Sequence, residues 1–421
     1  MPPTIFISAG EASGEHYGAL VVAALQTRLA AAGQTGQAGQ AARFYGMGGE
    51  RMATAGLECV VRSEEMAVMG LTEVVRHLPR IWREFRKLKR AIRQDPPSVA
   101  VLIDFPEIHF RLASELHRLG VPVVYFVSPQ LWAWKKKRIR LVQKYIDKML
   151  VIFPFEEPFY LEQGVEAEFV GHPLAELAPS SASRAEFAAA NGLHPEKTWI
   201  GLLPGSRPKE IRDLLPEILR AARQLAARAN EPAGFEFILP LAPTLNAAQR
   251  DEVRRLAEAH GAGLTLRLIN DIGAEGAVGP TAGGARTTLQ HARASVVASG
   301  TATVEAALAG NPFVVVYRVS PLTFAIAKRV VKVPFVSMVN LIAGRQVVPE
   351  LIQSDFTAEK IVREIERLLP DGPPRQSMIE ELAQVHGLLS ARPPSSGAAS
   401  AGGAIARVAA VTLETMREDS V

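Results

Sequence analysis

The sequence has 421 residues, of which 48% are hydrophobic and 21% are charged, a composition that indicates a globular protein of two ordinary domains. A single cysteine, Cys59, excludes a disulfide framework and is typical of a reducing compartment. The net charge is only +4, no apolar run is long enough to span a bilayer, and the first residues lack the pattern of a signal peptide, so we expect a cytoplasmic protein.

The first half of the chain alternates short apolar runs with helical stretches. The runs that we predict as strands are residues 4–9, 98–105, 122–128, 148–153 and 167–171. Each is apolar throughout rather than at every second position, which is typical of parallel strands covered on both faces. The second half repeats the scheme over residues 199–206, 235–243, 264–269, 295–301 and 313–320.

A segment rich in Pro, Ser and Ala, residues 172–187, separates the two halves and indicates a linker. We therefore predict an α/β fold of two doubly wound, Rossmann-like domains facing a cleft, with boundaries at 1–175 and 190–389. Ligands of such sheets bind beyond the carboxyl ends of the strands, so we expect the functional residues there.

The loop after the first strand reads "SAGEASGEHYGA". Its glycines Gly10, Gly14 and Gly18 are spaced by four, which differs from the dinucleotide fingerprint. Glycine permits close approach of a ligand, and free amides at a helix start favour a phosphate. Glu11 and Glu15 oppose a phosphate, so the sequence leaves the ligand of this loop open.

Residues 66–75 are mostly apolar, and residues 76–93 are dense in arginine and lysine. An apolar patch beside a basic helix is the composition of a surface that rests on anionic lipid. A core-facing helix with a solvated basic side has the same pattern, so both interpretations stand.

Asp104 ends the predicted strand 98–105. A carboxylate at this position is a candidate general base or, alternatively, a turn cap, and Glu107 and His109 are near enough to support it. Residues 125–142 combine two tryptophans with a basic run, but no nucleic-acid recognition motif is present. We expect a solvated helix face there and no nucleic-acid partner.

Two loops of the second half favour a nucleotide diphosphate. In "GLLPGSRPKEI" Arg207 follows a strand and a glycine loop, and its planar guanidinium suits a diphosphate. In "SVVASGTATVEAAL" a helix begins at Ser299-Gly300-Thr301, and Glu305 is positioned to bind a ribose diol or, alternatively, to lie in solvent. No P-loop and no metal-binding His/Cys cluster is present, so we expect neither metal nor cofactor.

Three segments are rich in small residues: 30–42, 273–285 and 390–403. We expect the first two to be loops and the third to be a flexible tether. The tether leads to a terminal helix, so residues 390–421 form a third region that packs on the other domain or on a second subunit.

Taken together, these stretches resemble the lipid-A-disaccharide synthase family, glycosyltransferases of the GT-B type (family 19). The motifs that carry the resemblance are "SAGEASGEHYGA", "GMGGERM", "MAVMGLTEV", "VSPQLWAW", "FPFEEPFY", "FVGHPLAE", "LLPGSRPKEI", "ASGTATVEAALAGNPFVVVYRVSPLTFAIAKRVVK" and "VSMVNLIAGRQVVPELIQ". The resemblance implies that UDP-2,3-diacylglucosamine condenses with 2,3-diacylglucosamine 1-phosphate (lipid X). The products would be a β-1,6 disaccharide 1-phosphate and UDP, with inversion at the anomeric carbon.

The resemblance also implies roles for individual residues. Asp104 matches the base of the family. Glu11 is an alternative base or, with Asp104 as the base, a group that orients a hydroxyl or assists in proton transfer, and the sequence leaves this choice open. The residues implied at the UDP-sugar are Gly205, Ser206, Arg207, Ser299, Gly300, Thr301 and Glu305. Those implied at the acceptor or in the cleft are Gly10, Ser13, Gly14, Asn340, Arg345 and Gln353. The implied membrane patch consists of Met66, Val68, Met69, Leu71, Val74, Val75 and Leu78.

The expected partners are the two lipid substrates, the cytoplasmic face of the inner membrane and, through the terminal helix, a second copy in a homodimer. Glu107 and His109 stand where relatives usually have Asp and Asn, so the support around Asp104 differs. Two alternatives remain: an enzyme like UDP-N-acetylglucosamine 2-epimerase, and a non-catalytic protein that binds a nucleotide sugar.

Overall fold

The computed structural model describes most of the chain, which folds into two compact units. Unit 1 comprises Met1–Glu176 and Leu389–Val421, and unit 2 comprises Leu177–Leu388. The described residues are 3–31, 42–66, 71–134, 136–228, 234–270, 283–321, 323–325, 333–390 and 402–418, without the side chains of 12, 71–78 and 417–418. Most of the three segments rich in small residues, 30–42, 273–285 and 390–403, lies outside them.

Unit 1 is built on a seven-stranded parallel sheet with the order β3-β2-β1-β4-β5-β6-β7. Its strands are β1 Thr4–Ala9, β2 Arg43–Gly48, β3 Glu58–Arg62, β4 Val99–Ile103, β5 Val123–Phe126, β6 Lys148–Val151 and β7 Ala167–Phe169. The helices are α1 Ala12–Ala31, α2 Glu50–Thr54, α3 Ser63–Met66, α4 Leu71–Gln94, α5 Pro106–Arg118, α6 Ile139–Tyr145, α7 Glu156–Glu162 and α17 Ala404–Glu418. The strand order reverses between β1 and β4, which makes this edge the expected ligand site of a doubly wound sheet.

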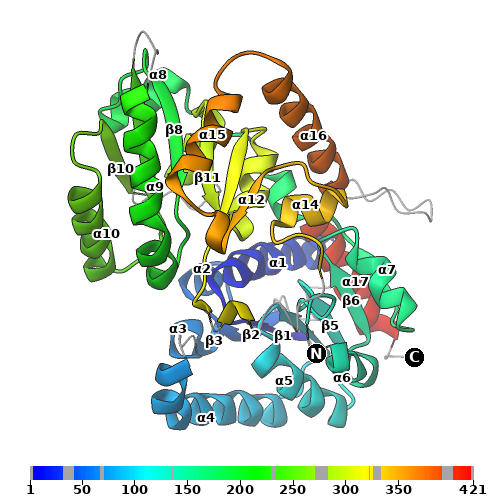
Figure 1. Cartoon of the computed structure of the whole chain (residues 1–421). Helices are drawn as coiled ribbons and strands as arrows, with labels where there is room; N and C mark the ends of the chain where they lie inside the picture. The colour runs from blue at the N-terminus through cyan, green and yellow to red at the C-terminus, as the bar shows by residue number, and fades with distance from the viewer. Residues whose placement is uncertain are drawn as a thin grey trace. The chain divides into compact units, whose positions relative to one another are not determined.

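The terminal helix α17 belongs to unit 1 and packs on α1, β4 and β5 (Figure 1). Val408 and Ala409 are fully buried in the core that α1 forms with the sheet. Arg407 binds both carboxylate oxygens of Glu168 in β7, and Glu176 accepts the N–H of Ala404 at the helix start. The helix therefore completes one face of the first sheet.

Unit 2 has a six-stranded parallel sheet with the order β10-β9-β8-β11-β12-β13. Its strands are β8 Thr198–Leu203, β9 Phe235–Leu241, β10 Leu266–Asn270, β11 Ala294–Ala298, β12 Phe313–Tyr317 and β13 Glu350–Ile352. The helices are α8 Arg184–Asn191, α9 Pro208–Arg228, α10 Ala247–His260, α11 Gly284–His291, α12 Thr301–Leu308, α14 Met338–Ala343, α15 Ala358–Leu368 and α16 Pro373–Leu389. The prediction of two doubly wound parallel α/β sheets is confirmed.

The segment predicted as a linker, residues 172–187, has structure of its own. Ser183 and Glu186 form a capping box that begins α8. The Ser180 N–H donates to Gln290 of α11 at 2.8 Å, so the part of the segment from Leu177 onward is bound to unit 2 rather than free.

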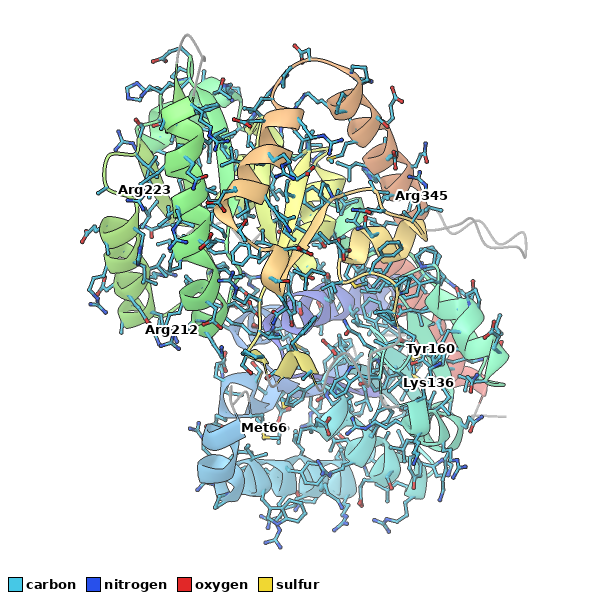
Figure 2. All side chains as sticks on the ribbon, in the orientation of Figure 1. Met66, Lys136, Tyr160, Arg212, Arg223 and Arg345 are labelled. Carbon is cyan, nitrogen blue, oxygen red and sulfur yellow. The ribbon has the colours of Figure 1, made fainter. Side chains whose placement is uncertain are left out.

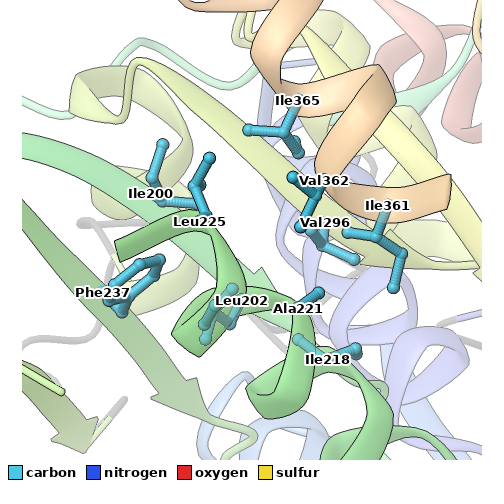
Figure 3. A pocket seen from close by; sticks show the side chains of 11 residues that line it. Ile200, Leu202, Ile218, Ala221, Leu225, Phe237, Val296, Ile361, Val362 and Ile365 are labelled. Atoms are coloured by element: carbon cyan, nitrogen blue, oxygen red, sulfur yellow. The ribbon is translucent and has the colours of Figure 1, made fainter. Parts of the chain in front are cut away.

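A narrow void lies inside unit 2 where α9 and α15 cover the sheet (Figure 3). Its lining is entirely aliphatic or aromatic: Ile200, Leu202, Ile218, Ala221, Ala222, Leu225, Phe237, Val296, Ile361, Val362 and Ile365. No polar group is present to orient a ligand, so the void is part of the core. Within the described part of the chain, no helix has the length and apolar composition to cross a bilayer.

Candidate functional site

Asp104 lies directly after β4, at the carboxyl edge of the first sheet. Its φ is 53° and that of Phe105 is 51°, both in the left-handed region. This conformation is uncommon for residues other than glycine and, for a bulky residue such as Phe105, costs of the order of 1 kcal/mol or more. Strain of this kind persists only where the surroundings hold it.

Three hydrogen bonds hold the backbone of Asp104. Its N–H donates to the carbonyl of Phe126 at 3.0 Å, so the ladder between β4 and β5 continues past the strand end. Its own carbonyl accepts from the Tyr125 hydroxyl at 2.5 Å and from Nδ1 of His109 at 2.6 Å. Both side chains are buried, so solvent does not compete with them.

The tautomer of His109 follows from its partners. A carbonyl only accepts, so Nδ1 carries the proton. Nε2 is then an acceptor, and the Ser8 hydroxyl donates to it at 2.8 Å. Burial lowers the pKa of His109 to about 4, which keeps the ring neutral near pH 7. Ser8, His109 and Asp104 form one buried chain of hydrogen bonds.

Gly10 makes room for the ring of Phe105. A Cβ on Gly10 would lie 2.3 Å from that ring, much closer than any real contact. The sequence predicted close approach of a ligand at this glycine, and the structure shows close approach of Phe105.

Asp104 and Glu11 are brought together as two neighbouring carboxyl groups. Asp104 is half-buried and Glu11 is exposed. Burial, and then the negative charge of Glu11, raise the pKa of Asp104 to about 7, while the amide of Phe105 opposes the shift. A carboxyl group with such a pKa can accept a proton from a hydroxyl near neutral pH.

The second carboxylate of the first loop, Glu15, has a structural partner. Its Oε1 accepts the N–H of Arg51 at 2.9 Å at the start of α2. A Cβ on Gly49 would lie 2.4 Å from the same oxygen, so a larger residue there would displace the Glu15 carboxylate. Glu15 thus caps α2. Ser13 is exposed at the start of α1, and Gly14 is buried against Ile103.

In unit 2, the two predicted nucleotide loops follow neighbouring strands. The sheet order reverses between β8 and β11, and the loops with Arg207 and Ser299 leave these two strands at their carboxyl ends. Gly205 has a φ of 108°, which favours glycine, and Ser206 is exposed. Arg207 is 59% exposed and pairs with Glu210 at 2.9 Å on the first turn of α9.

The turn before α12 is held on both sides. Ser299 donates its N–H to Val316 at 3.0 Å and its hydroxyl to Val336 at 3.1 Å. Gly300 has a φ of 149°, and Thr301 begins α12 with an exposed side chain. Glu305, one turn later, is half-buried, and its charge partly offsets the desolvation that lowers the pKa of Arg286. These loops present amides and an arginine at one sheet edge.

The side chains of Asn340 and Gln353, predicted to line the cleft, make hydrogen bonds to other residues of unit 2. Asn340 is fully buried; its amide donates to Val348 and Glu350 and accepts the N–H groups of Val347 and Val348. Gln353, with a φ of 53°, makes two hydrogen bonds to the backbone of Val319 at 2.7 and 3.0 Å.

Arg345 binds Glu381 and Gln384 on α16. Asn340, Arg345 and Gln353 therefore brace the loops around β13 and α14.

One member of the predicted membrane patch requires correction. Met66, labelled in Figure 2, is 2% exposed and belongs to the core under α4, so it is not available to a bilayer. Val68 and Met69, and the side chains of Leu71, Val74, Val75 and Leu78, lie outside the described residues. On the following turns of α4, Trp82 is 53% exposed, and the guanidinium of Arg86 lies 5.7 Å from its ring centroid.

Sequence reasoning missed Ser8, Tyr125 and Glu156. Ser8 is a polar residue within the apolar strand β1, and this was the signal available for it, whereas Glu156 begins α7 and carried no such signal. Among the described residues, no group of three His, Cys, Asp or Glu side chains is placed to hold a metal ion.

Comparison with known proteins adds independent information. A family model for lipid-A-disaccharide synthetase matches residues 5–390. A lipid-A-disaccharide synthase of Acidobacterium capsulatum is 56% identical over 99% of this chain and 97% of its own length. Those of Koribacter versatilis and Myxococcus xanthus are 50% and 42% identical, over 90% and 92% of this chain and 92% and 94% of their own lengths.

Solved structures with similar folds are more distant in sequence. The UDP-GlcNAc 2-epimerase from Neisseria meningitidis, bound to UDP-GlcNAc, has a TM-score of 0.58 at 13% identity over 99% of both chains. The calicheamicin glycosyltransferase CalG4 has a TM-score of 0.57 at 18% identity over 100% of both chains. At these identities the likeness concerns the fold alone.

Proposed function

The chain belongs to the lipid-A-disaccharide synthase family, and we propose from this membership how its own residues carry out the reaction. The protein is a glycosyltransferase of lipid A biosynthesis that condenses UDP-2,3-diacylglucosamine with lipid X. We assign the general base to Asp104, because it combines a strand-end position, a fixed backbone and a pKa near neutrality.

In this mechanism Asp104 accepts the proton of the acceptor's 6-hydroxyl as that oxygen attacks the anomeric carbon. The bond from the anomeric carbon to the UDP oxygen breaks on the opposite face, so the configuration inverts, and Asp104 later returns its proton to solvent. Glu11 raises the basicity of Asp104 and is placed to orient the acceptor. Ser13, Gly14 and the first amides of α1 follow Glu11 directly in the chain, and we assign them to the acceptor's 1-phosphate.

We assign the UDP leaving group to the edge of unit 2. Arg207 supplies a planar cation, and the amides after Ser299 and Gly300 lie at the positive end of α12. Gly205, Ser206 and Thr301 flank these groups, and Glu305 is assigned to the ribose. Asn340, Arg345 and Gln353 act by bracing the neighbouring loops.

Both substrates carry acyl chains, so we further propose peripheral contact with the cytoplasmic face of the inner membrane through α4. This helix exposes Trp82 with Arg80, Arg83, Arg86 and Arg90, and each such cation contributes about 1 kcal/mol near an anionic surface. Co-sedimentation with anionic vesicles that weakens after Arg86→Glu with Arg90→Glu supports this contact. Equal binding by the charge-reversed variant contradicts it.

The decisive experiment incubates purified protein with UDP-2,3-diacylglucosamine and lipid X and measures disaccharide 1-phosphate and UDP. Asp104→Asn should lower kcat by about 10²–10⁴-fold while leaving the Kd for UDP unchanged. Arg207→Ala should instead act mainly on UDP binding and raise the Kd for UDP by about tenfold or more. A large loss of UDP affinity in Asp104→Asn would mean that its role is misassigned.

A further inference from the structure

A group of aromatic side chains lies at the same sheet edge as Asp104. Trp132 follows β5, and Phe153 and Phe155 follow β6; all three are half-buried. The rings of Trp132 and Phe155 meet edge to face with centroids 4.9 Å apart. Those of Phe153 and Phe155 are parallel within 2° at 5.7 Å. We call these three residues the aromatic wall.

The backbone connects the aromatic wall to Asp104. The Asp104 N–H donates to Phe126 at 3.0 Å, and the Val127 N–H donates to Leu150 at 3.2 Å, so β4, β5 and β6 stay paired beyond their ends. Two strand spacings separate the ends of β4 and β6 by roughly 10 Å, and the wall residues lie in the loops that follow β5 and β6. Val127 has a φ of 63°, which is strained for a β-branched residue and turns the chain toward Trp132.

One buried carboxyl group holds the wall in place. Glu156 is 1% exposed; its Oε1 accepts from Trp132 Nε1 at 3.2 Å and its Oε2 accepts from the Phe153 N–H at 3.1 Å. The side chain thereby ties the loop after β5 to the loop after β6. Burial raises the pKa of Glu156 to about 8, so the group is mostly uncharged near neutral pH and suits an apolar setting.

Three polar atoms next to the aromatic wall make hydrogen bonds inside the protein. The Ser128 hydroxyl lies 2.7 Å from that of Tyr160, which is labelled in Figure 2, and Nδ1 of His172 accepts the N–H of Leu174 at 3.1 Å. The ring of His172 lies beside Phe153 with centroids 5.4 Å apart. A sugar needs hydrogen-bonding groups beside its stacking ring, whereas a hydrocarbon chain needs only the ring faces.

We propose that the aromatic wall binds an acyl chain of the acceptor and that Glu156 is the positioning residue that holds it. This inference rests on the proposed function, since it places the acceptor in unit 1 beside Asp104. It makes Trp132 and Phe155 determinants of acyl-chain specificity.

The test compares two acceptors, lipid X with long acyl chains and an analogue with short ones, at fixed donor and detergent concentrations. Trp132→Ala should raise the KM for the long-chain acceptor about tenfold and change the KM for the short-chain acceptor less than about twofold, with kcat unchanged. Phe155→Ala should act in the same direction, and Trp132→Phe should retain most of the discrimination. Leu161→Ala, which removes an exposed apolar side chain from α7, is the matched control and should leave both KM values unchanged.

Glu156→Ala should reproduce the chain-length effect of Trp132→Ala in protein whose thermal unfolding shows an intact fold. If Trp132→Ala affects both acceptors equally, or responds to the donor's chain length instead, the proposal for the wall is overturned while the proposed function stands. If the wild-type protein forms no disaccharide from either acceptor, the proposed function is wrong, and so is the proposal that the aromatic wall binds an acyl chain of the acceptor.

Discussion

Glu11 and Asp104 follow two residues that are directly paired, because Ala9 at the end of β1 is in register with Ile103 at the end of β4. The pairing brings two carboxyl groups to one point of the sheet edge. Burial, together with the charge of Glu11, raises the pKa of Asp104 to about 7. Burial is the larger cause of this raised pKa, and strand register adds to it by placing the charge of Glu11 beside Asp104.

The first prediction concerns the pH dependence of kcat/KM. Only ionised Asp104 accepts a proton, so kcat/KM should fall about tenfold per pH unit below pH 7. Glu11→Gln removes the neighbouring negative charge, lowers the pKa of Asp104 and should move this limb to lower pH. Glu162→Gln, which removes an exposed carboxylate from α7, should leave the limb in place. If Glu11→Gln leaves the acid limb of the profile in place, the charge of Glu11 does not raise the pKa of Asp104, and this prediction is wrong.

The second prediction concerns stability. Since the pKa of Asp104 rises from 3.8 to about 7 on folding, the folded protein keeps a proton that the unfolded chain releases between these values. The associated stability is fully present below pH 3.8 and is lost as the pH rises to 7, by at most about 4 kcal/mol.

Asp104→Asn abolishes this dependence. The unfolding temperature of the variant relative to wild type should therefore increase between pH 4 and pH 8, as measured by calorimetry. A constant difference would mean that Asp104 titrates alike in both states.

The third prediction concerns His109. His109→Ala removes the Nδ1–H donor to the Asp104 carbonyl and leaves the Ser8 hydroxyl without its buried partner. We expect kcat to fall about 10–100-fold with a small change in KM, because the base is displaced rather than removed.

His109→Asn is the informative companion, since an amide N–H can donate to the same carbonyl. It should recover part of the lost kcat. Equal losses in both variants, accompanied by equal losses of thermal stability, would indicate a role in packing alone.

The fourth prediction concerns α17. Val408 is fully buried against α1 and the first sheet, so Val408→Asp should destabilise unit 1 by about 3 kcal/mol or more. Glu414→Ala, on the exposed side of the same helix, should cost less than about 1 kcal/mol. Thermal unfolding measures both, and light scattering of the wild type tests the predicted homodimer.

Much of the fold followed from the hydrophobic pattern. The apolar run 98–105 predicted β4 and placed Asp104 at its end, because a strand covered on both faces leaves a clear signal. The pattern missed β2, β3 and β13. In β2, Gly46 breaks the apolar run, yet a Cβ there would lie 2.0 Å from the carbonyl oxygen of Ile7, so only glycine permits this pairing.

The site was predictable to the extent that it depends on strand ends. Asp104 and Glu11 meet because parallel strands end at one edge, and topology alone implies this. The partners of Glu15 and Gln353 depend on tertiary contacts between residues distant in sequence, and single residues carry no signal of such contacts. The same holds for Glu156, which resembles a surface carboxylate until its burial is known.

The position of α17 has a consequence for synthesis. In the sequence, unit 2 is inserted between the two segments that form unit 1. The ribosome therefore completes unit 2 before it makes the helix that covers one face of the first sheet. At roughly 5–20 residues per second, the nascent first sheet exposes the apolar surface around Val22 and Phe126 for on the order of ten seconds or more. Synthesis of unit 1 thus begins before that of unit 2 and ends after it. In this interval, protection of the uncovered face of the first sheet by a chaperone matters most.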